Sequence, residues 1–405
     1  MSYKKINIVV FLTLIQFSVM ANVKNPLILL SIDGFSNTYL EKYQPPNLLS
    51  LAKNGVRAQA LTPVYPSKTF PNHLSIVTGV YPAKHGIVHN RFYRPDLNKS
   101  YYLGAGKDDS SWLTAQPIWT VAELQGLRTA VYFWPESEAT ISETLPTYYY
   151  PYQHNTPNIT RVNQLINWLK LPSEERPQLL ISYFSTVDSA GHEHGPNSKQ
   201  VALAVKEVDQ LIGLLVSRIN NEINQDVNIV IVSDHGMVPL TKSPIKIANL
   251  LEEDDKLTLV NGQTQLLIYS DSDALVKNAH SQLSANNGLD KKFKVYRKKH
   301  FPQSWHLTGD SPAIPDLIVE AIQPFYFTSS KRRTVASHGF DPLNDKELAA
   351  IFIAAGPDFI APQTINAFEN IHIYPLLAKL LGIKPNNQID GNIKVLESII
   401  DINNH

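Results

Sequence analysis

Short, almost uninterrupted apolar runs recur along this chain, and the segments between them are long enough for helices. Runs that are apolar at every position suit strands buried on both faces, as in a parallel sheet covered by helices. The runs that predict strands are Leu27–Ile32, Thr129–Trp134, Leu179–Phe184, Asn228–Val232, Leu317–Ala321 and Ala349–Ala354. Amphipathic spacing predicts helices at Leu48–Asn54, Ile159–Lys170, Lys199–Asn221 and Ile371–Leu381. This alternation predicts an α/β fold with a mostly parallel central sheet flanked by helices.

The alternation covers most of the 405 residues, which is ample length for a large buried core. Between about 241 and 299 the pattern weakens and charge rises, which predicts a small inserted lobe. We therefore expect one catalytic domain over 22–405 that contains this insert. Lysine plus arginine and aspartate plus glutamate both total 36, so the net charge gives no reason to expect a stable nucleic-acid complex.

The first residues have the pattern of an export signal. Lys4 and Lys5 precede an apolar run over 6–20, and the small residue Ala21 follows it. We interpret 1–21 as a signal peptide of an exported protein, periplasmic or secreted. The alternative is a retained membrane anchor, but the run is short for a span of about 20 residues and lacks a stop-transfer pattern. No other segment is apolar enough to cross a bilayer. The absence of cysteine does not by itself choose a compartment, but together with the absence of appended adhesive modules it favours a bacterial periplasmic or secreted protein.

Acidic and imidazole side chains follow three of the predicted strands. Asp33 follows the first strand, Asp188 comes shortly after Leu179–Phe184, and Asp234 and His235 follow Asn228–Val232. In an open α/β sheet, ligands bind outside the carboxyl ends of the strands, so we expect these residues at one edge. A single aspartate there commonly caps a helix or starts a turn, but three with histidine partners favour a metal site.

The spacing of these residues suggests two sets of ligands. Asp188 and His192 are four residues apart around Gly191, so both side chains can face one ion, and His338 could supply a third ligand. The second set consists of Asp33, Asp234 and His235. Aspartate and histidine sets with an open position suit catalytic zinc, and a chain without cysteine cannot form a thiolate zinc site.

Thr69 is the candidate nucleophile. It stands just before Pro71, a residue suited to the first turn of a helix, so a helix starting here would aim backbone N–H groups at an anion. A bare hydroxyl is a poor nucleophile, but coordination to zinc would lower its pKa and fix its direction. The other interpretation is an N-cap threonine that only satisfies backbone donors. The neighbouring Lys68 could contact phosphate, but we expect a solvated side chain, and we expect His73 to be a local structural or surface histidine.

Six separated segments together resemble the nucleotide pyrophosphatase/phosphodiesterase family of the alkaline phosphatase superfamily. They span about residues 27 to 359 in the family's order. The segments are S-I-D-G-F from Ser31, P-S-K-T-F-P-N-H from Pro66, G-V-Y-P-A-K-H-G-I-V-H-N from Gly79, V-D-S-A-G-H-E-H-G from Val187, S-D-H-G-M from Ser233 and S-H-G-F from Ser337. The resemblance implies an alkaline-phosphatase-like fold and a site with two zinc ions.

The resemblance also implies roles for single residues. One zinc would be held by Asp188, His192 and His338, and the other by Asp33, Asp234 and His235, with Thr69 as its reactive ligand. Asn90 would donate to a non-bridging phosphate oxygen. The aromatic slot for a nucleobase would be formed by Phe70 and Tyr183, with Tyr152 as a third candidate.

The implied function is hydrolysis of nucleotide phosphodiester or pyrophosphate bonds through a covalent threonine intermediate, with release of a nucleoside 5′-monophosphate. One alternative uses the same site on a different substrate, as a choline lysophospholipid phosphodiesterase of the phospholipase C type. Phe70 with Tyr183 favours a base over a lipid. Thr69 and Asn90 argue against phosphate monoester or sulfate ester hydrolysis, and the complete ligand set argues against a non-catalytic binding module.

Overall fold

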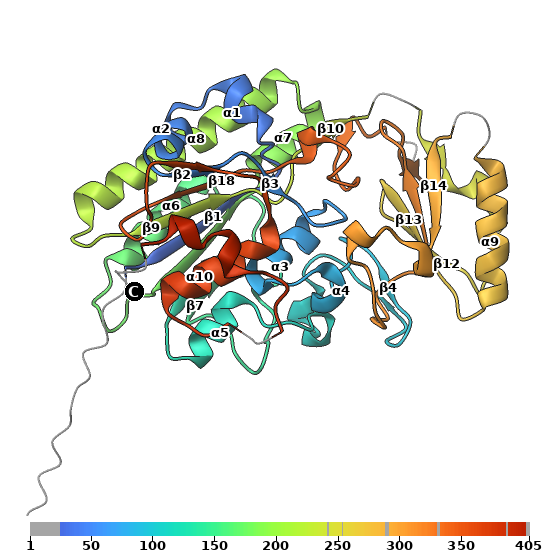
Figure 1. Cartoon of the computed structure of the whole chain (residues 1–405), viewed down its shortest axis with the longest axis horizontal. Helices are drawn as coiled ribbons and strands as arrows, with labels where there is room; N and C mark the ends of the chain where they lie inside the picture. Colours follow the sequence, from blue (N-terminus) through green and yellow to red (C-terminus); the bar gives the residue numbers. More distant parts are fainter. Residues whose placement is uncertain are drawn as a thin grey trace, which may run out of the picture.

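The computed structural model describes residues 25–240, 243–252, 254–287, 291–329, 333–385 and 388–401. The predicted signal peptide over 1–21 lies outside these residues. The described part consists of a large unit built on one sheet and a lobe built on a second sheet, which lie side by side in Figure 1.

An eight-stranded sheet is the centre of the large unit, in the order β19-β2-β18-β9-β1-β8-β6-β7. Its strands are β1 (Leu27–Ile32), β2 (Val56–Ala58), β6 (Thr129–Tyr132), β7 (Tyr148–Tyr150), β8 (Leu179–Phe184), β9 (Asn228–Val232), β18 (Phe352–Ala355) and β19 (Gln363–Ile365). Only β18 runs against the others, pairing antiparallel with both β9 and β2. Every residue of β1, β8 and β9 is buried, as the apolar runs predicted. The predicted mostly parallel sheet is confirmed.

Helices cover both faces of this sheet (Figure 1). One layer contains α1 (Thr38–Tyr43), α2 (Pro46–Asn54), α6 (Asn158–Leu169), α7 (Thr186–His194) and α8 (Lys199–Glu222). The other layer contains α3 (Thr69–Thr78), α4 (Pro82–His85), α5 (Ile118–Leu124) and α10 (Ile373–Leu381). The longest helix, α8, begins where the Ser198 side chain accepts a hydrogen bond from the Val201 N–H, and it buries one apolar stripe.

The lobe has its own antiparallel sheet, in the order β12-β13-β15-β14, with helix α9 (Asp273–Asn286) against it. The strands are β12 (Thr258–Asn261), β13 (Gln265–Tyr269), β14 (Phe293–Arg297) and β15 (Leu317–Ala321). The run Leu317–Ala321 was predicted as a strand and is one, but it pairs in the lobe. The lobe sheet therefore extends beyond the predicted insert at 241–299.

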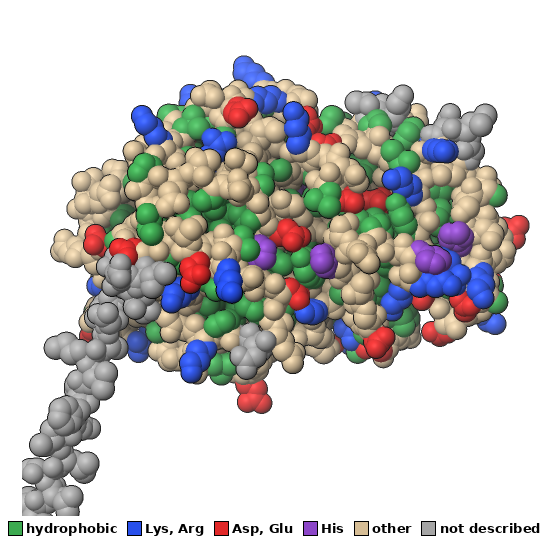
Figure 2. Space-filling model, in the orientation of Figure 1, with side chains coloured by type: hydrophobic (Ala, Val, Ile, Leu, Met, Phe, Trp, Pro, Cys, Tyr) green, Lys and Arg blue, Asp and Glu red, His purple; other side chains and the backbone are tan. Residues whose placement is uncertain are grey.

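Short strand pairs complete the structure. They are β3 (Leu61–Thr62) with β20 (Phe368–Glu369), β4 (Tyr93–Arg94) with β5 (Lys99–Ser100), β10 (Val238–Pro239) with β17 (Ala336–Ser337), and β11 (Ile245–Lys246) with β16 (Phe327–Thr328). Figure 2 shows acidic and basic side chains interspersed on one face, in keeping with a formal net charge of zero. Among the described residues, none of the helices combines the length and the apolar character that a membrane crossing requires.

Candidate metal centre and active site

The site lies at the carboxyl ends of three neighbouring strands. β1 lies between β8 and β9, so Asp33 after β1 and Asp234 after β9 leave the sheet at the same edge. Asp188 reaches this edge from the first turn of α7, which follows β8. The turn after β1 requires glycine, because Gly34 has a φ of +69° and a Cβ there would lie 2.9 Å from the Cα of Asp188. The sequence prediction that these aspartates meet at one edge agrees with this arrangement.

Asp33, Asp234 and His235 form a deeply buried group. The Nε2 atom of His235 lies 2.8 Å from Oδ2 of Asp234 and 3.6 Å from Oδ1 of Asp33. The side chains of all three are at most 2% exposed. The second oxygen of Asp234 accepts a hydrogen bond from the Gly34 N–H at 3.1 Å, which orients the carboxylate. We call these three residues the deep group.

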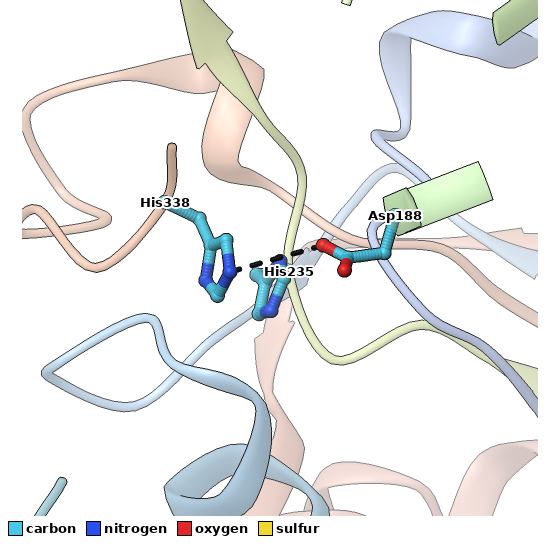
Figure 3. A group of neighbouring side chains, drawn as sticks. All are labelled: Asp188, His235 and His338. Carbon is cyan, nitrogen blue, oxygen red and sulfur yellow. Dashed lines mark ion pairs between the residues drawn. The ribbon is translucent and has the colours of Figure 1, made fainter. Parts of the chain in front are cut away.

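Asp188, His192 and His338 form a second group, in which His338 is buried and the other two side chains are partly exposed. Nε2 of His192 lies 3.1 Å from Nε2 of His338 and 3.4 Å from Oδ1 of Asp188. The side chain of His192 is 35% exposed and that of Asp188 is 16% exposed. Figure 3 shows Asp188, His235 and His338 converging from separate segments, with an ion pair of 3.8 Å between His338 and Asp188. We call Asp188, His192 and His338 the open group.

The two groups touch each other. The rings of His235 and His338 stack with their centroids 3.5 Å apart. Donor atoms of Asp188, His235 and His338 lie within 4.8 Å of one another, as do those of Asp33, Asp234 and His235. His235 is therefore within reach of both groups, and the geometry offers two adjacent positions for metal ions.

The three histidines are oriented by the backbone. Nδ1 of His192 faces the Ala336 carbonyl at 3.3 Å, Nδ1 of His235 faces the Gly236 carbonyl at 2.9 Å, and Nδ1 of His338 faces the Ser67 carbonyl at 2.8 Å. A backbone carbonyl can only accept, so each ring places its proton on Nδ1. Each Nε2 is then left with a lone pair directed into the site, which is the form that ligates a metal.

The carboxylates fit a bound cation. Three buried oxygens, Oδ1 of Asp33, Oδ1 of Asp188 and Oδ2 of Asp234, have no hydrogen-bond partner among the described residues. Burial and neighbouring carboxylates raise the pKa of both Asp33 and Asp234, while burial lowers the pKa of His235 and His338. Uncompensated negative charge and neutral imidazoles at one point match the ligands that a divalent ion such as zinc takes.

Thr69 is the first residue of α3, and its hydroxyl faces the deep group. Oγ1 of Thr69 lies 3.3 Å from Nε2 of His235. Lys68 occupies the N-cap position and makes no side-chain cap hydrogen bond. The expected structural role of His73 agrees with the structure, because this buried ring contacts the Ser31 hydroxyl and the Thr69 carbonyl. The N-cap interpretation of Thr69 is therefore wrong, since Thr69 follows the N-cap residue, and its role as a nucleophile stays a prediction.

Beside Thr69 lies a cavity of about 520 Å³, which we call the first cavity. The predicted substrate residues that line it are Phe70, Asn90, Tyr152 and Tyr183. The side-chain oxygen Oδ1 of Asn90 accepts a hydrogen bond from the Phe70 N–H at 3.0 Å, so the NH₂ group of the same side chain remains as the donor available to a phosphate oxygen. The first cavity is also lined by Tyr102, Lys107, Asp108, Glu136 and Glu138, which the sequence analysis did not single out.

Two contacts at the site were not foreseen. The Tyr183 hydroxyl donates to Oδ2 of Asp33, so this residue is both a wall of the first cavity and a partner of a candidate ligand. Lys68 is not solvated as expected: it is 4% exposed, and its amine donates to the His338 carbonyl at 2.7 Å. Burial lowers the pKa of Lys68 to about 7. A lysine beside a hydroxyl residue carries no pattern that distinguishes a buried amine from a solvated one.

The sheet order, the two helical layers and the paired aspartate and histidine groups at the strand ends define an alkaline-phosphatase-like α/β protein. A family model described as type I phosphodiesterase/nucleotide pyrophosphatase matches residues 27–341. The chain belongs to this family.

Individual relatives agree with this assignment. Ectonucleotide pyrophosphatase/phosphodiesterase family member 1 of Rattus norvegicus is 34% identical over 390 residues, which cover 92% of this chain and 42% of the relative. Venom phosphodiesterase 2 of Crotalus adamanteus is 33% identical over 395 residues, covering 92% of this chain and 47% of the relative. The chain thus spans less than half the length of these curated relatives. The solved structure of murine ectonucleotide pyrophosphatase/phosphodiesterase 5 superposes with a TM-score of 0.85 at 28% identity, covering 93% of this chain and all of that one.

Proposed function

We propose that this chain hydrolyses phosphodiester and pyrophosphate bonds of nucleotides and releases a nucleoside 5′-monophosphate. The observation that carries the proposal is the position of the Thr69 hydroxyl, 3.3 Å from His235 at the entrance to the deep group. A nucleophile there faces the first cavity on one side and the candidate metal ligands on the other. The names of the relatives support this substrate class. One solved neighbour is an inactive threonine-to-alanine variant of the murine protein in complex with AMP.

We further propose two zinc ions as the cofactors. The deep group with Thr69 would hold one ion, and the open group would hold the other. The three unpartnered carboxylate oxygens and the three lone pairs on Nε2 support these sets. Bound zinc would lower the pKa of the Thr69 hydroxyl and stabilise negative charge on the phosphate oxygens.

The residues then act in two displacements. Thr69 Oγ forms a bond to phosphorus and gives up its proton to water, while the leaving oxygen departs with the electron pair of the broken bond. Asn90 donates from its NH₂ group to a non-bridging oxygen, which is a neutral contact suited to a diester with a single charge. Water then attacks from the vacated side, the bond to Thr69 breaks, and one hydrogen of that water restores the hydroxyl.

One observation favours a second candidate, the choline lysophospholipid phosphodiesterase. The first cavity combines aromatic residues with carboxylates, and this combination also suits a quaternary ammonium group. The residues concerned are Tyr102, Asp108, Glu138 and Tyr152. Carboxylates equally accept hydrogen bonds from the amino groups of nucleobases, so this observation alone does not displace the nucleotide proposal.

Three chromogenic substrates separate these functions. Purified zinc-loaded protein is given p-nitrophenyl thymidine 5′-monophosphate, p-nitrophenyl phosphorylcholine and p-nitrophenyl phosphate under identical conditions. A kcat/KM larger by orders of magnitude for the nucleotide ester supports the proposal. Preference for phosphorylcholine would replace the nucleotide with a lipid, and preference for the monoester would contradict the role of Asn90.

The proposal includes export of the enzyme to the periplasm or the surrounding medium. It rests on the signal pattern over residues 1–21. N-terminal sequencing of protein recovered from the periplasm and the medium of an expressing bacterium tests it, because cleavage near Ala21 gives a new N-terminus. Uncleaved protein in the membrane fraction would support the anchor instead.

A further inference from the structure

A glutamate in a left-handed backbone conformation lies in the wall of the first cavity. This residue, Glu136, has a φ of +62° and is 4% exposed. Such a conformation is uncommon for a residue with a Cβ, and it persists only where the surrounding contacts outweigh its cost. We propose that Glu136 is a positioning residue for the nucleotide, because it fixes the loop 101–108 as a wall of the first cavity. The inference rests on the proposed function and adds to it a residue that sets the preference for a nucleoside over smaller groups.

Both oxygens of the Glu136 carboxylate bind this loop. Oε1 accepts from the Tyr101 hydroxyl, and Oε2 accepts from the Gly106 N–H at 2.9 Å. Burial raises the pKa of Glu136 to about 6, so near neutral pH the carboxyl is mostly ionised and acts only as an acceptor. Hydrogen bonds to a charged acceptor are stronger than neutral ones. The carboxylate therefore holds the loop firmly at two separate points.

The fit between Glu136 and the loop requires a glycine at position 106. A Cβ on Gly106 would overlap Oε2 of Glu136 and would lie 3.1 Å from Cβ of Ala139. Gly106 is the middle residue of a single 3₁₀ turn over Ala105–Lys107, in which Ala105 and Gly106 are buried. The carboxylate thus lies directly against the backbone of this turn.

The loop that Glu136 holds forms one wall of the first cavity. The residues that it contributes to the lining are Tyr102, Leu103, Gly104, Lys107 and Asp108. At the tip of the loop, Tyr102 is 55% exposed and Leu103 is 51% exposed. An exposed tip gains little stability from packing, so the position of this wall depends on the contacts at the base of the loop. Glu136 makes two of these contacts.

Tyr101 also connects Glu136 to the candidate base slot. Its buried ring stacks on Phe92 with the centroids 4.7 Å apart, and it meets the ring of Phe70 in a T-shaped contact at 6.4 Å. Phe70 is a candidate wall of the nucleobase slot and lines the same cavity. The carboxylate of Glu136 is therefore coupled to the slot from two directions, through the loop and through the Tyr101 ring.

The turn that carries Glu136 is itself anchored to the helix that begins at Thr69. The Trp134 indole N–H donates to the His73 carbonyl in α3 at 3.2 Å, and the Ser137 N–H donates to the Trp134 carbonyl at 3.1 Å. The loop is thus fixed, through Glu136, relative to the candidate nucleophile. A wall that is preformed in this way needs little ordering when a nucleotide binds.

The backbone conformation separates the role of the side chain from the role of the turn. A glycine at position 136 would adopt the same φ without strain, so the turn itself does not require a glutamate. Both hydrogen bonds of the Glu136 side chain go to the loop. Glu136→Gly therefore keeps the turn and removes only the attachment of the loop.

The test uses two phosphate diesters that differ in the group that enters the first cavity. p-Nitrophenyl thymidine 5′-monophosphate presents a nucleoside, and methyl p-nitrophenyl phosphate presents only a methyl group. In Glu136→Gly, the KM for the nucleotide ester is expected to rise about tenfold, while its kcat changes by less than about twofold. The kcat/KM for the methyl ester should stay within about twofold of the wild-type value, because a methyl group does not reach the wall.

Three further variants complete the test. Glu136→Gln should restore the KM, because its side-chain oxygen accepts from the Gly106 N–H and its NH₂ group donates to the Tyr101 oxygen. Tyr101→Phe keeps the ring and removes one hydrogen bond, so the KM for the nucleotide ester should rise about threefold. The matched control is Glu143→Gly, since Glu143 also has a positive φ, of +57°, but is exposed and does not line the first cavity. It should leave both substrates unaffected.

The outcomes distinguish the inference from the proposed function. Equal losses for both esters in Glu136→Gly, or no change for either, would overturn the inference while the proposed function stands. Circular dichroism checks that the variants are folded. If Glu136→Gly does not fold, an unchanged KM for the nucleotide ester in Tyr101→Phe would overturn the inference instead. A wild-type protein that hydrolyses neither ester would overturn the proposed function together with the inference.

Discussion

Lys68, the residue before the candidate nucleophile, donates a hydrogen bond from its buried amine to the backbone carbonyl of His338, at 2.7 Å. The residues are 270 positions apart in the chain, and the contact joins the start of α3 to a candidate ligand of the open group. The position of Thr69 and the position of His338 are thus coupled through one side chain.

Lys68→Met keeps the length of the side chain and removes this contact. We expect a fall in kcat of about tenfold and weaker zinc binding at the open group, because the His338 segment loses a fixed partner. Stopped-flow turnover and zinc titration measure the two effects. The control is Lys53→Met in α2, whose side chain is exposed. Unchanged turnover together with reduced stability would show that Lys68 has only a structural role.

Thr69→Ala removes the candidate nucleophile and little else. Turnover should fall by at least about a thousandfold, because the covalent step has no acceptor, while the protein should retain its fold and nearly all of its zinc. Activity assays with elemental analysis and circular dichroism check this. Thr69→Ser keeps a hydroxyl and is expected to retain measurable turnover. Wild-type rates in the alanine variant would remove Thr69 from the mechanism.

Tyr183→Phe deletes only the hydroxyl that donates to Asp33. The hydrogen bond lowers the pKa of Asp33, against the larger effect of burial, so its loss makes this carboxylate harder to ionise. Zinc affinity should therefore fall about tenfold to a hundredfold, and the fall should be larger at lower pH. Because the ring remains, the KM for a nucleotide ester at saturating zinc should change little. Competition with a colorimetric chelator across pH 6 to 8 measures the affinity, and a pH-independent result would contradict the argument.

Glu320 is a buried carboxyl in β15 of the lobe, and burial and the nearby Asp341 raise its pKa to about 8. Its folded-state pKa therefore lies above its unfolded value of about 4.3. The stability that it contributes is fully present below the unfolded pKa and is lost as the pH rises through about 8. Glu320→Gln should remove this loss and raise the free energy of unfolding above pH 8, by at least about 1 kcal/mol relative to wild type.

Urea denaturation at pH 6 and pH 9 checks this prediction. Glu207→Gln, at an exposed position of α8, is the matched control and should leave the pH dependence as it is in the wild type. A Glu320→Gln protein that is equally destabilised at both pH values would indicate that the carboxyl is ionised and paired throughout this range.

The strands that carry the site could be predicted from the sequence. The bounds of β1, β8 and β9 agree with the predicted runs to the residue, because each run is apolar at all but one position and is followed by a polar residue. The predicted run Thr129–Trp134 ends earlier, at Tyr132, since Phe133 has a φ of +68° and leaves the extended conformation. Since parallel strands end at one edge, the meeting of Asp33, Asp188 and Asp234 could also be predicted.

Other features had no signal in the sequence. A run buried on both faces has the same pattern in either sheet, so the pairing of β15 in the lobe could not be predicted. The contacts of Lys68 and Tyr183 depend on where a side chain points after distant segments have packed. Glu136, which accepts from the Tyr101 hydroxyl and the Gly106 N–H beside the first cavity, is a single acidic residue in a loop without any periodic context. The roles assigned to Phe70, Asn90 and Tyr152 remain predictions until substrate is bound.

The unequal exposure of the two ligand groups has a consequence for handling the protein. The deep group is at most 2% exposed, whereas His192 of the open group is 35% exposed. If the two groups hold metal ions as proposed, we expect these ions to exchange with the medium quickly at the open group and slowly at the deep group. An ion in the deep group can leave only when the surrounding structure opens. The metal content of a preparation is then expected to depend on how the protein was purified. A brief exposure to chelator should remove only the ion of the open group, and one equivalent of metal should restore the fully loaded protein.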